Sequence, residues 1–402
     1  MNPCGIDRKG RHIGVIEPAR GVSATVLTSL VIALASCLSY NDPTNVQEIC
    51  KPRPSMRGTE VPACLWAQGK IDPATYRAAD SLLASAVRLG DSELGDTGAN
   101  VYYKYVELVR AVGHVADFYN EGLFPDSVRF NRLVDHVAVT AEYARGTIRK
   151  YNNVYYPART PQLGWTYYQS YGFYFQPVNT VQQLSYLLGA PTASLDTLSK
   201  LGQAVWAYAV WHRGGGRDFP IWEYEFPWYA SGAVWLFPPW QSAMAQGTVM
   251  ELFTELYRRT QEPIWRNRAR AVFECFRVSM DDGGVLLPDT THGYWWEEYH
   301  PRVMVWNGSV KALLTLGDYA QTFHDTTALR MYASGVGAVK FYTPRYDTGT
   351  WTYYSLTGYL NTRYYHGFQV QELDALYVQN GDPWFKTLAD RWRGYTAPPG
   401  VP

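Results

Sequence analysis

Apolar side chains recur at helical spacing along most of the chain downstream of residue 70. This spacing predicts helices over 98–120, 126–150, 176–188, 194–211, 241–260, 263–280, 307–325, 326–341 and 364–379. Two more helices are predicted to begin at Asp72-Pro73 and Asp382-Pro383, because Asp caps a helix and Pro fits its first turn. Short β-hairpins are predicted near 281–299 and 342–356, where Asp-Gly, Tyr and Thr cluster. The pattern predicts a mainly α fold, an α/α toroid (incomplete α/α barrel) with small β-hairpin elements in the loops.

The first 70 residues show a pattern of a different kind. A basic segment precedes an apolar run over 22–35, which is too short to span a bilayer. The run closes on Leu-Ala-Ser-Cys, which resembles a bacterial lipobox and predicts that Cys37 is the lipidated first residue of the mature protein. An ordinary secretory signal or an N-terminal anchor is the alternative, and all three export the rest of the chain. We expect 1–37 to be a lipoprotein-type signal peptide, 38–70 a Pro-containing tether, and the protein to be membrane-anchored in the cell envelope, in the periplasm or at the cell surface.

Cysteine, histidine and charge narrow the function classes. Cys50 and Cys64 lie within the predicted tether, and we predict that they pair after export. The five Cys form no CxxC pair and the eight His form no HExxH motif, so we predict no metal and no cofactor. The formal net charge is +0, which leaves no global field to attract nucleic acid.

Aromatic residues make up 15% of the chain, with 32 Tyr and 15 Trp, and they concentrate in the connections between predicted helices. The two densest groups are Trp165, Tyr167, Tyr168, Tyr171, Phe173, Tyr174 and Phe175, and Trp222, Tyr224, Phe226, Trp228, Tyr229, Trp235, Phe237 and Trp240. Loops at one end of a helical toroid converge on a central cleft. Tyr and Trp offer a flat apolar face together with a hydrogen-bonding edge, which suits a sugar ring. We therefore expect an aromatic-lined sugar cleft, with a Tyr-rich core as the alternative.

Five short motifs occur in the same connections. They are Gly172-Phe173-Tyr174-Phe175, WQSAMAQG at 240–247, WWEEY at 295–299 followed by Asn307-Gly308, YDTG at 346–349 leading to Tyr354-Ser355-Leu356, and Tyr365-His366 before the closing helices. Over about 165–395 this series resembles the D-glucuronyl C5-epimerase family. The resemblance implies an epimerase-like α/α catalytic domain at 161–402. The segment before it does not resemble the β-rich N-terminal region of the animal enzymes, and its helical spacing predicts an N-terminal helical region at 71–160. The resemblance also implies an isomerase that converts D-glucuronate to L-iduronate, or an equivalent hexuronate, within a heparosan-like glycosaminoglycan.

Such a reaction removes an unactivated C–H proton and returns one to the opposite face. The site needs an acid or base on each face and donors around the substrate carboxylate. The resemblance places the catalytic set on Glu298, Tyr299, Tyr354 and Tyr365. Glu298 is the expected base, because neighbouring aromatic rings would raise its pKa by desolvation. Tyr365 is the expected acid on the opposite face, and which Tyr transfers the proton is left open.

The substrate-binding set follows from the same motifs and their surroundings. Its members are Trp165, Tyr174, Trp240, Gln246, Trp296, Asn307, Arg345, Arg363 and His366. Animal members of the family carry an Arg three residues after the Tyr that matches Tyr354, whereas this chain has Thr357 there. Recognition of the uronate charge is therefore expected elsewhere, with Arg363 and Arg345 as the candidates.

Two other functions are compatible with these residues. A polysaccharide lyase begins with the same C5 proton abstraction, and a non-catalytic glycan-binding lipoprotein would keep the cleft without turnover. The expected partners are an acidic polysaccharide substrate and a membrane reached only through a lipid anchor, with no nucleic acid. The oligomeric state is left open, a homodimer included.

Overall fold

The computed structural model describes most of the chain downstream of residue 49. The described residues are 5–6, 12–13, 50–93, 99–149, 154–182, 194–230, 234–289, 291–297 and 303–402. Residues 5–6 and 12–13 pair as strands β1 (Gly5–Ile6) and β2 (His12–Ile13). Cys37 and the apolar run before it lie outside the described residues, so the lipoprotein signal stays a prediction. Within the described part, no helix is both long enough and apolar enough to cross a membrane.

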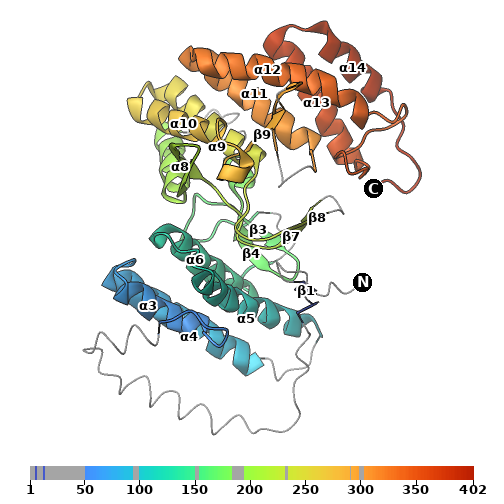
Figure 1. The fold of residues 1–402 in the computed structure, drawn as a ribbon. Coiled ribbons are helices and arrows are strands. Elements are labelled where there is room, and N and C mark those ends of the chain that lie inside the picture. The colour runs from blue at the N-terminus through green and yellow to red at the C-terminus, as the bar shows by residue number, and fades with distance from the viewer. Residues whose placement is uncertain are drawn as a thin grey trace.

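The N-terminal helices pack together in the lower half of the molecule (Figure 1). They are η1 (Gly58–Glu60), α3 (Val61–Ala67), α4 (Pro73–Glu93), α5 (Ala99–Asn120) and α6 (Ser127–Ala144). The predicted Cys50–Cys64 disulfide is confirmed, with the two Cα atoms 5.3 Å apart. The prediction of a tether is wrong for 50–70, because Val61 and Leu65 are fully buried in the same core as α4 and α5. Apolar residues at helical spacing over 61–65 were the signal for this.

In the part of the chain that the structure describes, four antiparallel hairpins lie between and within the helical parts. They are β3 (Trp165–Tyr168) with β4 (Gly172–Phe175), β5 (Val210–Gly214) with β6 (Arg217–Ile221), β7 (Trp228–Ala230) with β8 (Val234–Leu236), and β9 (Leu286–Asp289) with β10 (Gly293–Trp296). Only the last was predicted. The hairpin expected near 342–356 is instead the short helix η3 (Thr343–Tyr346) followed by isolated bridges.

The C-terminal helices form the upper half of the molecule (Figure 1). They are α8 (Leu195–Ala207), α9 (Ala243–Thr260), α10 (Pro263–Cys275), α11 (Trp306–Phe323), α12 (Thr326–Tyr342), α13 (Arg363–Asn380) and α14 (Pro383–Arg393). α14 begins as predicted, with Asp382 accepting a hydrogen bond from the Trp384 N–H at 3.0 Å. α9 packs against α10 and α11, and α13 packs against α14. The mainly α prediction is confirmed, and the α/α toroid stays a prediction.

Among the described residues, the buried apolar side chains form two clusters. One runs through α8–α14 and the hairpins against them. The other joins the N-terminal helices to Tyr174, Tyr224, Phe226 and Trp240, which come from the region downstream of residue 160. The N-terminal helices therefore share a core with the predicted catalytic domain, and this shared core lies beside the pocket described next.

Candidate active site

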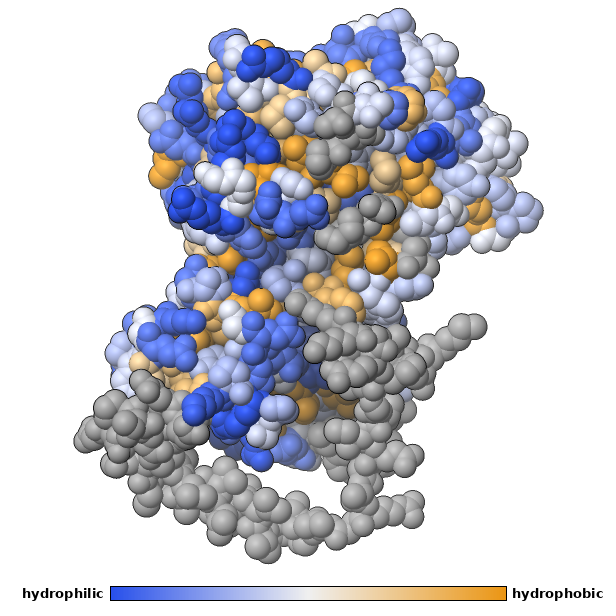
Figure 2. Space-filling view, in the orientation of Figure 1, coloured by the Kyte–Doolittle hydropathy of each residue, from blue (hydrophilic) through white to orange (hydrophobic). Residues whose placement is uncertain are grey.

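A pocket of about 270 Å³ lies where the hairpins meet the first turns of α9, α11 and α13. Its lining residues are Tyr168, Gln176, Val178, Asn179, Gln182, Tyr224, Phe226, Trp228, Trp240, Met244, Asn307, Tyr354, Tyr364, Tyr365 and Phe368. Figure 2 shows apolar residues exposed near the junction of the two halves. The lining is aromatic, as the sequence predicted, and it is also rich in hydroxyl and amide groups. Among the described residues, none that lines it carries a charged side chain.

The rings on one side of the pocket are held by the backbone around residue 224. Tyr224 and Trp240 exchange two backbone hydrogen bonds, at 2.8 and 3.1 Å, and their rings stack with centroids 4.1 Å apart. The Trp240 indole donates to the Phe226 carbonyl at 2.7 Å. The Phe226 ring in turn lies 4.1 Å from the ring of Tyr168. These contacts fix four aromatic rings that line the pocket.

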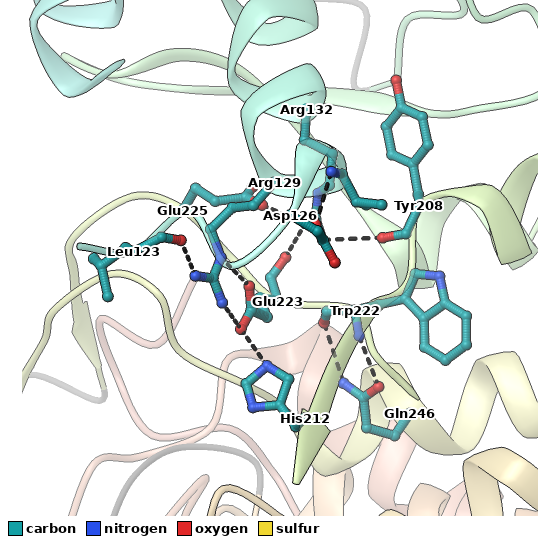
Figure 3. A network of polar contacts seen from close by, with 11 residues as sticks. Leu123, Asp126, Arg129, Arg132, Tyr208, His212, Trp222, Glu223, Glu225 and Gln246 are labelled. Carbon is teal, nitrogen blue, oxygen red and sulfur yellow. Dashed lines mark hydrogen bonds and ion pairs between the residues drawn. The ribbon is translucent and has the colours of Figure 1, made fainter. Parts of the chain in front are cut away.

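A buried ionic network connects this segment to α6 (Figure 3). Glu223 and Glu225 flank Tyr224 in the chain and pair with arginines of α6. Arg129 donates to both carboxylate oxygens of Glu223, at 2.9 and 2.8 Å. Arg132 Nη2 lies 2.8 Å from Glu225 Oε1. Alternate residues of the segment therefore serve two purposes, one set lining the pocket and the other tying it to α6.

The two glutamates titrate far apart because their partners differ. Burial would raise the pKa of Glu223, but the Arg129 guanidinium and a hydrogen bond from His212 Nε2, at 2.6 Å, bring it down to about 2. Burial raises the pKa of Glu225 to about 7, against the opposing charge of Arg132. Glu223 is therefore the permanent anion beneath the pocket at neutral pH.

Tyr354 and Tyr365 form another wall, with ring centroids 5.0 Å apart in an edge-to-face arrangement. The Tyr354 carbonyl accepts from the Trp306 N–H at 3.1 Å, which ties its loop to the start of α11. Tyr365 occupies the first turn of α13, where Thr362 caps the helix by accepting from the Tyr365 N–H at 3.2 Å. The structure therefore brings together two of the predicted catalytic residues.

Glu297, the first glutamate of the WWEEY motif, is bonded to the backbone of the fold and does not line the pocket. It is fully buried, and its two carboxylate oxygens accept from the N–H groups of Met304, at 2.8 Å, and Val305, at 3.2 Å. Its carbonyl accepts from the Ala243 N–H at 3.0 Å, at the start of α9. Glu298 and Tyr299 lie outside the described residues. The residue before them is thus held against the helix turn that contributes Met244 to the pocket.

Asn307 also lines the pocket, from the first turn of α11. Its side chain is 2% exposed, and its Oδ1 accepts no hydrogen bond from any described residue. A buried carbonyl oxygen without a donor costs stability. Asn307 therefore offers an acceptor that a hydroxyl or N–H group of a ligand would satisfy.

Four predicted binding residues are part of the core and do not line the pocket. Trp165 and Trp296 are fully buried, and their indole N–H groups donate to Thr160 Oγ1 and the Phe276 carbonyl. Gln246 is also fully buried, and its amide accepts from the Trp222 N–H and donates to the Trp222 carbonyl. Tyr174, at 1% exposure, stacks on His136 and hydrogen-bonds to His114 Nδ1 at 2.7 Å. We predicted that these four side chains contact the substrate. They are instead buried residues that pack inside the fold and do not line the pocket.

Three further predicted binding residues, the two cationic candidates among them, also lie outside the pocket. Arg345 is exposed and its guanidinium lies over the ring of Tyr342, 5.5 Å from the centroid. Arg363 and His366 instead line a groove between α13 and the C-terminal segment. His366 bonds to Thr352 Oγ1 at 2.8 Å and to the Trp392 carbonyl at 2.9 Å, so both ring nitrogens are occupied within the fold. The expectation that Arg345 or Arg363 meets the uronate charge in this pocket is therefore not supported.

Sequence reasoning missed the contribution of the segment after β4. Gln176, Asn179 and Gln182 bring three amides into the pocket, and Tyr168 reaches it from β3. Amides carry little functional signal in a single sequence, because they are common on any surface. Tyr168 was visible only as one ring in an aromatic cluster.

An aromatic, uncharged pocket lined by hydroxyls and amides has the chemistry that suits the faces and hydroxyl groups of sugar rings. Residues 217–394 match the family model of the D-glucuronyl C5-epimerase C-terminus. An uncharacterised protein of Methanocaldococcus jannaschii is 28% identical over 182 residues, covering 44% of this chain and 58% of that protein. A D-glucuronyl C5-epimerase of Caenorhabditis elegans is 31% identical over 179 residues, covering 39% of this chain and 29% of that protein. Over these residues the chain is similar to the C-terminal part of the D-glucuronyl C5-epimerase family, and the chain spans less than two thirds of either relative.

Proposed function

We propose that the protein catalyses C5 epimerisation of D-glucuronate to L-iduronate, or of an equivalent hexuronate, within an acidic polysaccharide. The observation that carries the proposal is the Tyr354–Tyr365 pair, set in an aromatic pocket inside the segment that matches the epimerase family. A neutral phenol with an ordinary pKa near ~10 can donate a proton or a hydrogen bond at neutral pH. With two phenol hydroxyls side by side, one can transfer a proton while the other donates a hydrogen bond to the charge that develops on the substrate carboxylate.

The chemistry assigns a role to each group. A base takes the C5 proton on one face, the substrate carboxylate receives the charge through donated hydrogen bonds, and an acid protonates C5 from the other face. Glu298 is our proposed base, since it follows Glu297, which is held at the start of α9. Tyr365 is the proposed acid, and Tyr354 and Tyr299 the proposed donors. Trp240 and Asn307 would bind the sugar, through a ring face and through the unsatisfied Oδ1.

We also propose that the protein works outside the cytoplasm, as a lipoprotein anchored through Cys37. The Cys50–Cys64 disulfide supports an exported location, because disulfides persist in oxidising compartments. Mass analysis of the N-terminal peptide from envelope material tests the anchor. A lipidated Cys37 supports it, and an unmodified Cys37 still attached to Ser36 overturns it.

Deuterium incorporation from solvent into a panel of uronate polymers tests the proposed reaction. The wild type should place deuterium at C5 and form the C5 epimer. Glu298→Gln and Tyr365→Phe should each lower exchange by about 10²–10⁴-fold, the usual cost of one positioned acid or base. Tyr377→Phe is the matched control, because Tyr377 lies on the same helix as Tyr365 but outside the pocket.

Three outcomes would overturn the proposal. Exchange by both variants at the wild-type rate would show that these residues do not carry the reaction. New ultraviolet absorbance from an unsaturated uronate would identify a lyase. Binding to the polymers without exchange would identify a non-catalytic glycan-binding protein.

A further inference from the structure

The side-chain amide of Gln176 has a fixed orientation. The Val178 N–H donates to Gln176 Oε1 at 2.9 Å, and a backbone N–H can only donate. The accepting atom is therefore the oxygen. The Tyr224 hydroxyl donates to the same oxygen at 3.0 Å, which occupies its second lone pair. Gln176 Nε2, the other half of the amide, points at the Tyr168 hydroxyl, 3.1 Å away.

This orientation determines what Tyr168 can do. An amide NH₂ group only donates, so the Tyr168 oxygen is the acceptor in its bond with Gln176. Its own O–H is not used in that bond and stays available to donate. Burial raises the pKa of Tyr168 well above its usual value, and the nearby Tyr365 hydroxyl raises it further, although the Gln176 bond opposes the shift. Tyr168 therefore keeps its proton at any working pH.

The surroundings show which acceptor this donor would meet. Tyr168 lines the same pocket as Tyr354 and Tyr365, but from the β3–β4 hairpin, and its ring is held by Phe226 and Trp228 at 4.1 and 5.8 Å. The described lining holds no Lys, Arg or His to pair with an anion. A carboxylate bound there would be held by neutral donors. A hydrogen bond from a neutral donor to a carboxylate is charge-assisted and stronger than one to a neutral oxygen.

We propose that Tyr168 is the pocket's carboxylate-recognition residue, donating its phenolic hydrogen bond to the hexuronate carboxylate, and that Gln176 is the positioning residue that leaves this proton available. The inference rests on the proposed function for its substrate class. It goes beyond it by assigning uronate specificity to a residue upstream of the segment that matches the epimerase family, which begins at residue 217.

Binding of a uronate polymer and of the same polymer after carboxyl reduction tests this assignment without needing turnover. The wild type should prefer the carboxylated form. Tyr168→Phe should reduce that preference by about 10–100-fold, the usual effect of losing a hydrogen bond to a charged group, while affinity for the reduced polymer stays the same. Tyr171→Phe is the matched control, since it lies in the same hairpin region next to Phe226 but outside the pocket lining. Equal loss of affinity for both polymers, or an unchanged preference, would overturn the assignment.

Gln176→Glu tests the positioning role with almost the same shape. The new carboxylate accepts from the Val178 N–H and the Tyr224 hydroxyl as before, but it would also accept from Tyr168 and so turn its proton away from the substrate. The preference for carboxylated polymer should fall, and adding Gln176→Glu to Tyr168→Phe should lower it little further. Fully additive losses would show that Gln176 does not act through Tyr168.

The two proposals fail separately. If the wild type prefers the carboxylated polymer through Tyr168 but exchanges no C5 hydrogen, the epimerase proposal fails and the recognition proposal stands. If exchange occurs and Tyr168→Phe keeps the wild-type preference, only the recognition proposal fails.

Discussion

Replacing Arg129 with Met removes the cation that faces the buried carboxylate of Glu223. Arg129 and Glu223 make two hydrogen bonds of 2.9 and 2.8 Å, and the Glu223 side chain is 1% exposed. Breaking one side of such a buried pair costs about 3–5 kcal/mol of unfolding free energy, because the remaining charge stays out of water. Met fills a similar volume, so the loss comes from the charge and not from a cavity.

The loss should depend on pH in a direction that follows from the pKa of Glu223. In the wild type this pKa is about 2, below the ordinary value of 4.5. The pair therefore contributes its full stability above pH 4.5 and loses it as the pH falls towards 2. Without Arg129, the bond from His212 is the main interaction left to oppose burial, and we expect the folded-state pKa of Glu223 to move above its ordinary value. The variant's carboxylate then destabilises more as the pH rises, so the difference from wild type grows between pH ~5 and ~8.

Urea unfolding followed by tryptophan fluorescence at pH ~5, ~6.5 and ~8 measures this difference. Arg213→Met is the control, because Arg213 lies 3.8 Å from Asp218 with both side chains mostly exposed. Such a pair contributes less than about 1 kcal/mol. A loss below about 1 kcal/mol for Arg129→Met at pH ~8, or the same loss at all three pH values, would refute the reasoning.

Two further predictions concern single features of the fold and the pocket. Asn307→Leu should weaken binding of the uronate polymer about 5–10-fold in a titration. The unfolding free energy should stay the same or rise by up to about 1 kcal/mol, because an unsatisfied buried oxygen is removed. Unchanged binding would contradict a role of Asn307 in recognition. Replacing Cys50 and Cys64 with Ser should destabilise the N-terminal helices by about 3 kcal/mol, as expected for a 14-residue separation. Urea unfolding with and without reductant checks it, and equal stability in both conditions refutes it.

The helices were predictable from sequence because their patterns are long and their caps are local. α11 (Trp306–Phe323) and α12 (Thr326–Tyr342) lie within one or two residues of the predicted ranges. The pocket residues Trp240, Asn307, Tyr354 and Tyr365 followed from motifs that occur in the loops and first turns of these helices. A motif can predict which residues lie together only when the helices and loops that carry them are also predicted correctly.

Three of the four hairpins were missed because their residues were taken as loops or, at 210–211, as the end of a helix. The Trp-Glu-Tyr-Glu-Phe segment at 222–226 alternates apolar and acidic side chains, which indicates extended structure. Gly215 and Gly216 both have positive φ, at 54° and 73°, and form the two-residue turn between β5 and β6. Their Gly-Gly sequence was the available signal for this hairpin. The burial of Glu223 and Glu225 had no such signal, since only the fold shows that two arginines of a distant helix meet them.

The segment that matches the epimerase family does not by itself make this pocket. Residues 217–394 contribute the Tyr354–Tyr365 wall and the ring of Trp240, which are the parts tied to the proposed proton transfer. Tyr168 and Gln176 come from the chain upstream, and the α6 arginines that hold the 222–226 segment lie further upstream still. If both proposals hold, the reaction and the choice of polymer depend on different parts of the chain. A relative that matches only the C-terminal segment can inform the chemistry, whereas polymer specificity has to be measured on this protein with its N-terminal helices in place.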